Sequence, residues 1–158
     1  MAKVFEIGIS KNFKGKMISV PYVEAITKSG LVSDRHFKEN NDKKCQITLI
    51  EVENIEYYNQ TFGTSIALVD FRRNIITKRI RLNELVDKVF VIGEVKVKGQ
   101  DLCRPCRHLQ ETLGKENIVK EFLRKGGLRC EILTNGKISV GDETVSYTHL
   151  TLPTNREV

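Results

Sequence analysis

The sequence is poor in cysteine and proline: four Cys and three Pro occur among its 158 residues. Four cysteines are too few for the disulfide scaffold of a small secreted protein. No apolar run approaches the roughly 18 residues that suggest a transmembrane helix, and the N-terminus lacks the apolar segment of a secretory signal. We therefore expect a cytoplasmic protein with reduced thiols and no membrane partner.

Aromatic residues are also scarce, at 7%. RNA-binding sheets stack bases on aromatic side chains that lie among basic ones, and the sequence shows no such interleaving, so we expect no nucleic-acid partner. The remaining composition is ordinary, with 40% hydrophobic and 29% charged residues, which excludes collagen-like and disordered chains. The length fits one domain with a substantial core.

Positive charge is in excess. The chain has 26 Lys and Arg against 20 Asp and Glu, a formal net charge of +6 at pH 7. Such a surface favours anionic ligands or partners.

The last residues do not continue the pattern of the rest. Residues 144–158 read TVSYTHLTLPTNREV and have no hydrophobic period of their own. They resemble the translated end of a sequencing-library adapter. We interpret residues 1–143 as the domain and residues 144–158 as a non-native tail. The tail holds one Arg and one Glu, so the domain keeps the charge of +6.

Short β-type runs dominate the domain. Two pairs of runs predict hairpins, one around Gly93 and one around Asn135-Gly136. The second prediction rests on the Asn-Gly dipeptide, which is the strongest short hairpin signal. The predicted strands are Lys3–Ser10, Lys16–Val20, Val23–Thr27, Gln46–Ile50, Asn74–Ile80, Val89–Ile92, Glu94–Val97, Leu128–Leu133 and Lys137–Val140.

Helical patterns are fewer. Residues 51–62 predict a helix with Ile55, Tyr58 and Phe62 on one face and Gly63 as its C-terminal stop. Residues 82–86 predict a short turn of helix or a loop, and residues 103–114 and 117–125 predict two further helices. Many short strands with a few helices predict a mainly β protein with helical insertions (α+β), a β-barrel of one domain.

One segment carries chemistry: residues 101–110 read DLCRPCRHLQ and contain a C-x-x-C pair, Cys103 and Cys106. Pro105 suits the first position of a helix. Cys106 would then lie in the first turn, where the helix dipole and the neighbouring basic residues stabilise a thiolate. A thiolate at neutral pH is a nucleophile or a ligand for a soft metal.

Other interpretations of the cysteines stay open. They could form half of a structural zinc site, although zinc takes four ligands and Cys45 and Cys130 are isolated. They could be two inert buried thiols. C-x-P-C also invites a thioredoxin-like interpretation, but that motif follows an early strand and opens a βαβ unit, whereas here it comes late and is followed by β-type runs.

Polar groups at three other places suit an anion such as phosphate. Ser10-Lys11 ends the first strand, Ser33-Asp34-Arg35-His36 follows Gly30, and Phe71-Arg72-Arg73-Asn74 opens a strand. Guanidinium and ammonium groups bind phosphate well. Each group alone is more typical of a solvated charge or a capping group than of a binding site.

The order of these pieces resembles the MOSC family, the domain at the C-terminus of molybdenum cofactor sulfurases. The resemblance spans residues 3–143. The matching stretches are GLVSDRHF (30–37), QITLIEVE (46–53), DFRRNI (70–75), LNELVDKVFVIGEVKVKG (82–99), DLCRPCRHL (101–109) and GGLRCEILTNGKISVGDE (126–143).

The resemblance implies a β-barrel that binds the molybdenum cofactor (molybdopterin). The family's characteristic cysteine matches Cys106, which either carries sulfur or binds molybdenum as a thiolate ligand. Beside what the resemblance implies, we take Cys103 as a second catalytic candidate, which either resolves a persulfide or disulfide or only packs. The positions that contact the pterin and phosphate are matched by a further set: Ser10, Lys11, Arg35, Arg72 and Asn74.

The chain departs from the family in three ways. Ser33-Asp34 replaces the usual Gly-Asp, Lys78-Arg79 stands where a glycine is common, and the N-terminal barrel half and desulfurase domain of larger relatives are missing. Pyridoxal phosphate belongs to that desulfurase, so we expect it only in a partner cysteine desulfurase; a molybdoenzyme is another possible partner. Sulfurtransferase-type or molybdenum-dependent activity stays open, as do a thiol-disulfide oxidoreductase and a non-catalytic anion-binding module.

Overall fold

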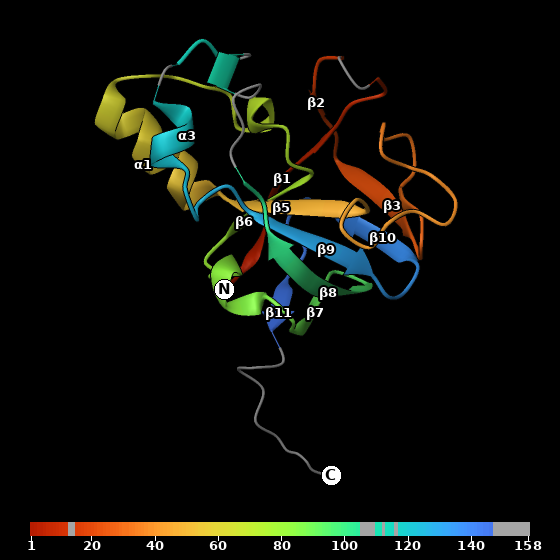
Figure 1. Ribbon diagram of the computed structural model, residues 1–158. Helices are drawn as coiled ribbons and strands as arrows, with labels where there is room; N and C mark the ends of the chain where they lie inside the picture. The colour runs from red at the N-terminus through yellow and green to blue at the C-terminus, as the bar shows by residue number, and fades with distance from the viewer. Residues whose placement is uncertain (13–14, 105–109, 112, 116, 147–158) are drawn as a thin grey trace.

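The computed structural model describes residues 1–12, 15–104, 110–111, 113–115 and 117–146. Strands dominate this part of the chain, as Figure 1 shows. The strands are β1 (Lys3–Ile9), β2 (Ile18–Ser19), β3 (Tyr22–Ile26), β4 (Gly30–Leu31), β5 (Ile47–Glu51), β6 (Ile75–Lys78), β7 (Val89–Ile92), β8 (Val95–Leu102), β9 (Leu128–Ile132), β10 (Gly136–Ser139) and β11 (Thr144–Ser146). The helices are α1 (Val52–Phe62) and α3 (Ile118–Glu121), with the 3₁₀ turns η1 (Leu68–Phe71) and η2 (Leu82–Leu85).

The main sheet has the strand order β11-β7-β8-β9-β5-β6-β1-β2. It curls, because the chain around β11 also meets the start of β1. Val4 exchanges backbone hydrogen bonds with Gly141 and Asp142, and the N–H of Thr144 donates to the carbonyl of Ala2. A smaller sheet, β10-β3-β4, lies beside it. The prediction of a mainly β, barrel-like single domain is confirmed.

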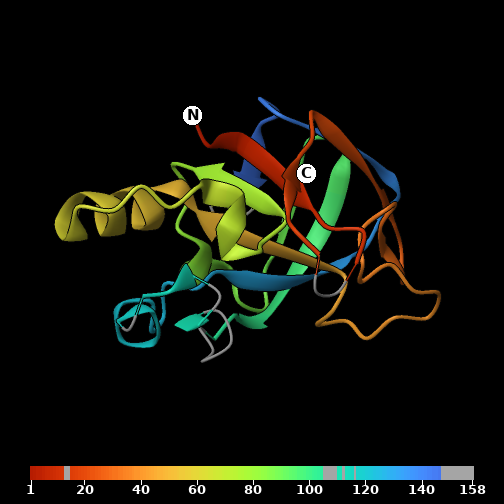
Figure 2. The ribbon, with the colours of Figure 1, turned by 90° about the horizontal axis from the view of Figure 1, so that it is seen from above.

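Two apolar clusters hold the fold together. The larger one lies inside the curled sheet and follows the period of two expected of strands: Val95 and Val97 are buried in β8, whereas Lys96 between them is exposed. The smaller cluster lies between the sheet and the helical side, where α1 and α3 are neighbours in both Figure 1 and Figure 2. There the rings of Tyr58 and Phe122 pack with centroids 5.4 Å apart.

Several local predictions are confirmed. Helix α1 ends where expected, because Gly63 adopts the left-handed conformation (φ 64°) that glycine tolerates best. Strands β7 and β8 pair antiparallel around Gly93.

None of the helices in the described part of the chain is long and apolar enough to span a membrane.

The hairpin predicted around Asn135-Gly136 is wrong. Strand β10 does not pair with β9; it pairs antiparallel with β3, so that the chain crosses from one sheet to the other at this turn. The Asn135 side-chain oxygen accepts the backbone N–H of Thr27, 108 residues away. The long-range pairing of β10 with β3 in the smaller sheet therefore overrides the local turn signal.

The helices predicted after β8 are shorter than expected. Cys103 and Arg104 are not helical, and α3 covers only Ile118–Glu121 of the predicted 117–125. The placement of Cys106 in a first helical turn lies outside the described residues. Of the segment set aside as a tail, Thr144–Ser146 form β11 and pair with β7, and residues 147–158 lie outside the described part.

Candidate functional site

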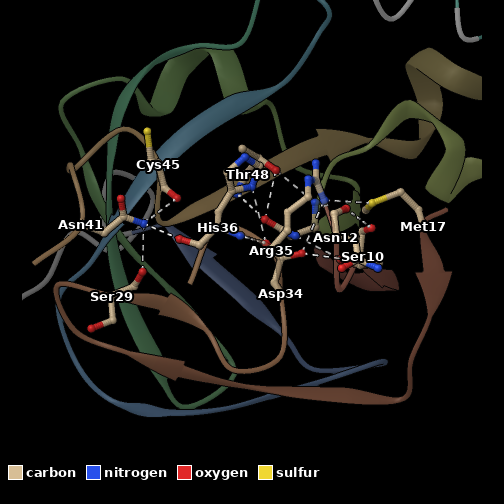
Figure 3. Close-up of polar contacts among 12 residues, drawn as sticks. Ser10, Asn12, Met17, Ser29, Asp34, Arg35, His36, Asn41, Cys45 and Thr48 are labelled. Carbon is tan, nitrogen blue, oxygen red and sulfur yellow. Dashed lines mark hydrogen bonds and ion pairs between the residues drawn. The ribbon is translucent and has the colours of Figure 1, made fainter. Parts of the chain in front are cut away.

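A buried carboxylate organises one end of the curled sheet. The Asp34 side chain is 1% exposed. Its Oδ1 accepts the backbone N–H of Ser10 at 3.0 Å, and its Oδ2 accepts that of His36 at 3.3 Å. Figure 3 shows these groups converging on the loop after β4. Burial raises the pKa of Asp34, but hydrogen bonds from His36 and Ser10 and the charge of Arg35 bring it below the ordinary value.

Arg35 lies beside this carboxylate and is itself buried, with 8% of its side chain exposed. Its Nη1 is 3.5 Å from Asp34 Oδ1 and donates to the thioether sulfur of Met17 at 3.2 Å. Its backbone N–H donates to the Ser10 carbonyl at 2.6 Å. A thioether is a weak acceptor, so Asp34 is the only charged partner that the described residues offer this guanidinium.

Two further arginines approach Arg35 from the connection between η1 and β6. Arg72 caps η1 in the left-handed conformation (φ 64°), and its Nη1 donates to the carbonyl of Gly15 at 2.9 Å. Arg73 Nε donates to the carbonyl of Gly126 at 2.8 Å. Burial lowers the pKa of Arg35; Asp34 opposes this, and the charges of Arg72 and Arg73 lower the pKa further. The site thus gathers like charges, an arrangement that favours an anion.

Ser10 and Lys11, predicted as contacts for a cofactor, lie at the end of β1. Ser10 is fully buried, and its Oγ donates to the carbonyl of Asn12. Lys11 is exposed. Ser10 is therefore part of the framework around Arg35, and Lys11 stands at the rim with its ammonium group open to solvent.

Asn74, another predicted contact, joins three strands. Its Oδ1 accepts the backbone N–H and the hydroxyl of Thr48, both at 3.2 Å, and its Nδ2 donates to the Gly8 carbonyl at 3.1 Å. The residue is 4% exposed. Both ends of its amide are taken up by the backbones of β1 and β5, which gives Asn74 a role in fixing the floor of the site.

The cysteine segment begins directly after β8. The Cys103 N–H donates to the carbonyl of Gly127 at 2.7 Å, and its side chain is buried. Burial raises the pKa of the Cys103 thiol; the charges of Arg73 and Arg129 oppose this without reversing it. Cys103 is therefore a protonated thiol at neutral pH. Cys106, the main predicted nucleophile and metal ligand, lies outside the described residues.

Among the described residues, Cys45 and Cys130 form no disulfide and no metal-ligand cluster with Cys103. Cys45 is exposed, and Cys130 is fully buried with a pKa raised well above the ordinary value by its burial. Within the described ranges, no group of three or more His, Cys, Asp or Glu side chains could hold a metal ion. This result gives no support to the structural zinc interpretation.

Sequence reasoning missed two members of the site. Asp34 and Arg73 both stand in segments that were singled out, beside residues that were assigned. The acid beside an arginine in Ser-Asp-Arg-His is the signal that the sequence offers for Asp34. No signal in the sequence separated Arg73 from Arg72, because their roles depend on which backbone carbonyl each guanidinium meets.

Comparisons with known proteins agree with this fold. A family model described as the MOSC domain matches residues 33–145. The YuaD protein from Bacillus subtilis superposes with a TM-score of 0.78 at 16% identity, over 90% of this chain and 93% of that chain. YiiM from Geobacillus stearothermophilus gives 0.74 at 16% identity (92% and 75%), and YiiM from Escherichia coli 0.66 at 17% (98% and 70%).

Identities this low make the structural likeness one of fold alone. A comparison with curated proteins finds no match.

Proposed function

Since this chain belongs to the MOSC domain family, which is associated with molybdenum cofactor binding, we propose that it binds that cofactor at the arginine site. Arg35 and Arg72 hold its phosphate, and Lys11 at the rim draws the anion in. Ser10, Asp34 and Asn74 hold the arginines and the floor in place. When bound, the cofactor supplies a molybdenum centre with soft sulfur ligation, which suits a cysteine thiolate as a further ligand.

One observation carries the proposal: the Arg35 guanidinium. It is 8% exposed, stands among two other arginines, and has only one carboxylate and one thioether as described partners. Burying a cation is costly unless it is paired, and Asp34 is the only carboxylate that the described residues place beside Arg35. A bound phosphate would supply the missing negative charge and the oxygen acceptors that guanidinium prefers.

The second part of the proposal concerns Cys106 and is based on the sequence resemblance. It either binds molybdenum as a thiolate or carries sulfur. In the second case its thiolate attacks the outer sulfur of a persulfide on a partner desulfurase; the new S–S bond forms on Cys106 and the partner's cysteine leaves as a thiolate. The segment that holds Cys106 starts at Cys103, whose pKa is influenced by Arg73 of the arginine site.

The test is to purify the full chain from cells that make the cofactor and to measure bound molybdenum and pterin. We expect both in the wild type, loss of both in Arg35→Gln, and pterin with reduced molybdenum or sulfur content in Cys106→Ser. Arg81→Gln is the matched control, because Arg81 is 85% exposed and follows the far end of β6. Absence of pterin from the wild type, or equal pterin in wild type and Arg35→Gln, would refute the binding proposal.

The alternative of a thiol-disulfide oxidoreductase needs Cys103 as an accessible partner of Cys106. The buried Cys103 thiol with its raised pKa gives that alternative no support. Failure of the purified chain to reduce insulin disulfides is the expected result.

A further inference from the structure

Met17 is buried beside the Arg35 guanidinium and has no part in the proposed function. The residue is 3% exposed and directly precedes β2, whose pairing with β1 fixes its backbone. Its Cε lies 3.3 Å from the position that a Cβ of Gly8 would take, so the methyl end rests on β1. The sulfur faces Arg35, as Figure 3 shows, and accepts a hydrogen bond from Nη1 at 3.2 Å.

Among the described residues, two side chains contact this guanidinium, and both meet it at one nitrogen. Met17 Sδ lies 3.2 Å and Asp34 Oδ1 3.5 Å from Nη1, whereas Nε and Nη2 have no acceptor in the described part of the chain. Those two nitrogens form an edge through which an arginine can bind two oxygens at once. Arg129 uses this edge in the same chain, because its Nε and Nη2 donate to the two carboxylate oxygens of Asp101. The same edge of Arg35 is therefore available to a ligand.

We propose that Met17 is a positioning residue, whose sulfur holds Nη1 so that the Nε–Nη2 edge of Arg35 receives two oxygens of the bound phosphate. The inference rests on the proposed function and refines it. A thioether suits this task because it accepts a hydrogen bond without carrying charge. A carboxylate in its place would hold Nη1 more strongly but would cancel the positive charge that attracts the anion. The ligand class is an oxyanion with two free oxygens on one centre, as in a phosphate monoester.

A packing role for Met17 predicts a different result. Met17 belongs to the smaller apolar cluster, so a change there also affects stability. Leucine keeps most of the volume and removes the acceptor, whereas glutamine offers an acceptor oxygen at a similar reach but buries a polar amide. If only packing matters, Met17→Leu is the better variant in both stability and affinity. If the sulfur orients Arg35, Met17→Gln is less stable and yet binds phosphate more tightly than Met17→Leu.

The most direct test exchanges the sulfur for a methylene group. The chain has two methionines, Met1 and Met17, and Met1 is 77% exposed, so growth on norleucine replaces one buried side chain with an isostere. Binding of inorganic phosphate to the full chain is measured by calorimetric titration at one fixed pH and one salt concentration, because salt screens such contacts. The same exchange in the Met17→Leu protein is the matched control, since only Met1 changes there. Met17→Gln tests for rescue.

We expect the norleucine exchange to weaken phosphate binding about three- to tenfold, the range of one hydrogen bond. The melting temperature should stay within about 3 °C of the wild type, because the side-chain volume is conserved. Met17→Leu should weaken binding by the same factor, and norleucine in that variant should change nothing further. Met17→Gln should restore the affinity to within about threefold of the wild type, despite a lower melting temperature.

Equal phosphate affinity of the methionine and norleucine proteins, when the wild type binds phosphate and carries pterin, overturns this inference alone. A folded Met17→Gln protein that binds phosphate no better than Met17→Leu does the same, and so does a wild type that carries pterin but does not bind phosphate. If Met17→Gln does not fold, the norleucine comparison decides by itself. A wild type that binds neither phosphate nor pterin overturns the proposed function as well.

Discussion

Asp34 Oδ1 accepts the backbone N–H of Ser10 at 3.0 Å, although 24 residues separate the two in the sequence. Through this bond the loop after β4 is fastened to the end of β1. Arg35, the next residue, is thereby held over the same strand end, where its own N–H donates to the Ser10 carbonyl. The most buried cation of the site is thus positioned by a reciprocal contact between two short segments.

Asp34→Asn should destabilise the fold by about 1–3 kcal/mol, because the amide loses the charge that faces Arg35 and can present a donor to the Ser10 N–H. Urea denaturation with an unchanged m-value measures this difference. Asp42→Asn is the matched control, since Asp42 is exposed and, among the described residues, its carboxylate accepts only the N–H of Lys44 within its own turn. Equal decreases in the free energy of unfolding for Asp34→Asn and Asp42→Asn would contradict the role of Asp34 in holding the site together.

The stability of the protein should fall in acid through the same carboxylate. The pKa of Asp34 in the folded protein lies below the ordinary value of 3.8. Its stabilising contribution is therefore complete above the unfolded pKa and is lost as the pH falls through the lower folded pKa. Melting temperatures measured from pH 6 to pH 2.5 should drop less steeply for Asp34→Asn below about pH 4. Asp101, whose pKa is lowered by Arg129, leaves a residual slope of the same sign; parallel curves for the two proteins would contradict the prediction.

Local elements were predictable from the sequence, and long-range pairings were not. The end of α1 at Gly63 and the β7–β8 hairpin follow from residues that lie next to one another. The Asn135-Gly136 turn carries an equally strong local signal, yet β10 pairs with β3, more than 100 residues earlier. The spacing of residues in the sequence does not predict this pairing. The pairing depends on which strand edge remains free once the main sheet has curled.

The candidate site shows the same division. The residue types at Ser10, Arg35 and Arg72 suggested an anion, but only the fold brings the three segments to one end of the sheet. Asn74 illustrates the opposite case. Its amide suits a ligand contact, whereas the structure engages both of its ends with the backbones of β1 and β5.

Gly127→Ala should be among the most damaging single substitutions in the chain. Gly127 has a φ of +112°, and a Cβ there would collide with the carbonyl group of Leu49. Backbone must move to relieve this clash, so we expect a loss of about 3 kcal/mol or more together with a displaced Cys103 segment. Gly63→Ala serves as the control for the positive φ alone, because Gly63 has a φ of +64° and no atom lies within 4 Å of a Cβ built there. We expect this substitution to lower the free energy of unfolding by about 1 kcal/mol. Similar decreases in the free energy of unfolding for Gly127→Ala and Gly63→Ala, measured by chemical denaturation, would refute the role of the clash with Leu49.

The cysteines should differ in their rates of reaction with a thiol reagent. In a Cys106→Ser protein, Cys45 is exposed and Cys103 and Cys130 are buried, and burial raises the pKa of both buried thiols. We expect one thiol to react rapidly with Ellman's reagent in the native protein and all three after denaturation. Cys45→Ser in the same background should remove the rapid phase. A rapid phase that survives this substitution would show that Cys103 or Cys130 is accessible.

Thr144→Val should stabilise the protein. Thr144 is 4% exposed, and its hydroxyl has no hydrogen-bond partner in the described part of the chain, so its removal relieves a desolvation cost of about 1 kcal/mol. Melting temperature should rise by about 2–4 °C. Thr77→Val is the matched control and should lower it, because the equally buried Thr77 hydroxyl donates to the Ile50 carbonyl.

A decrease in melting temperature for Thr144→Val as large as that for Thr77→Val would contradict this account of β11. An increase in melting temperature would support the prediction that a non-native tail starts at residue 144. In β11 the polar Thr144 and Ser146 occupy the buried positions, and the apolar Val145 between them is only half-buried. A strand selected for this barrel would place its apolar residues the other way round.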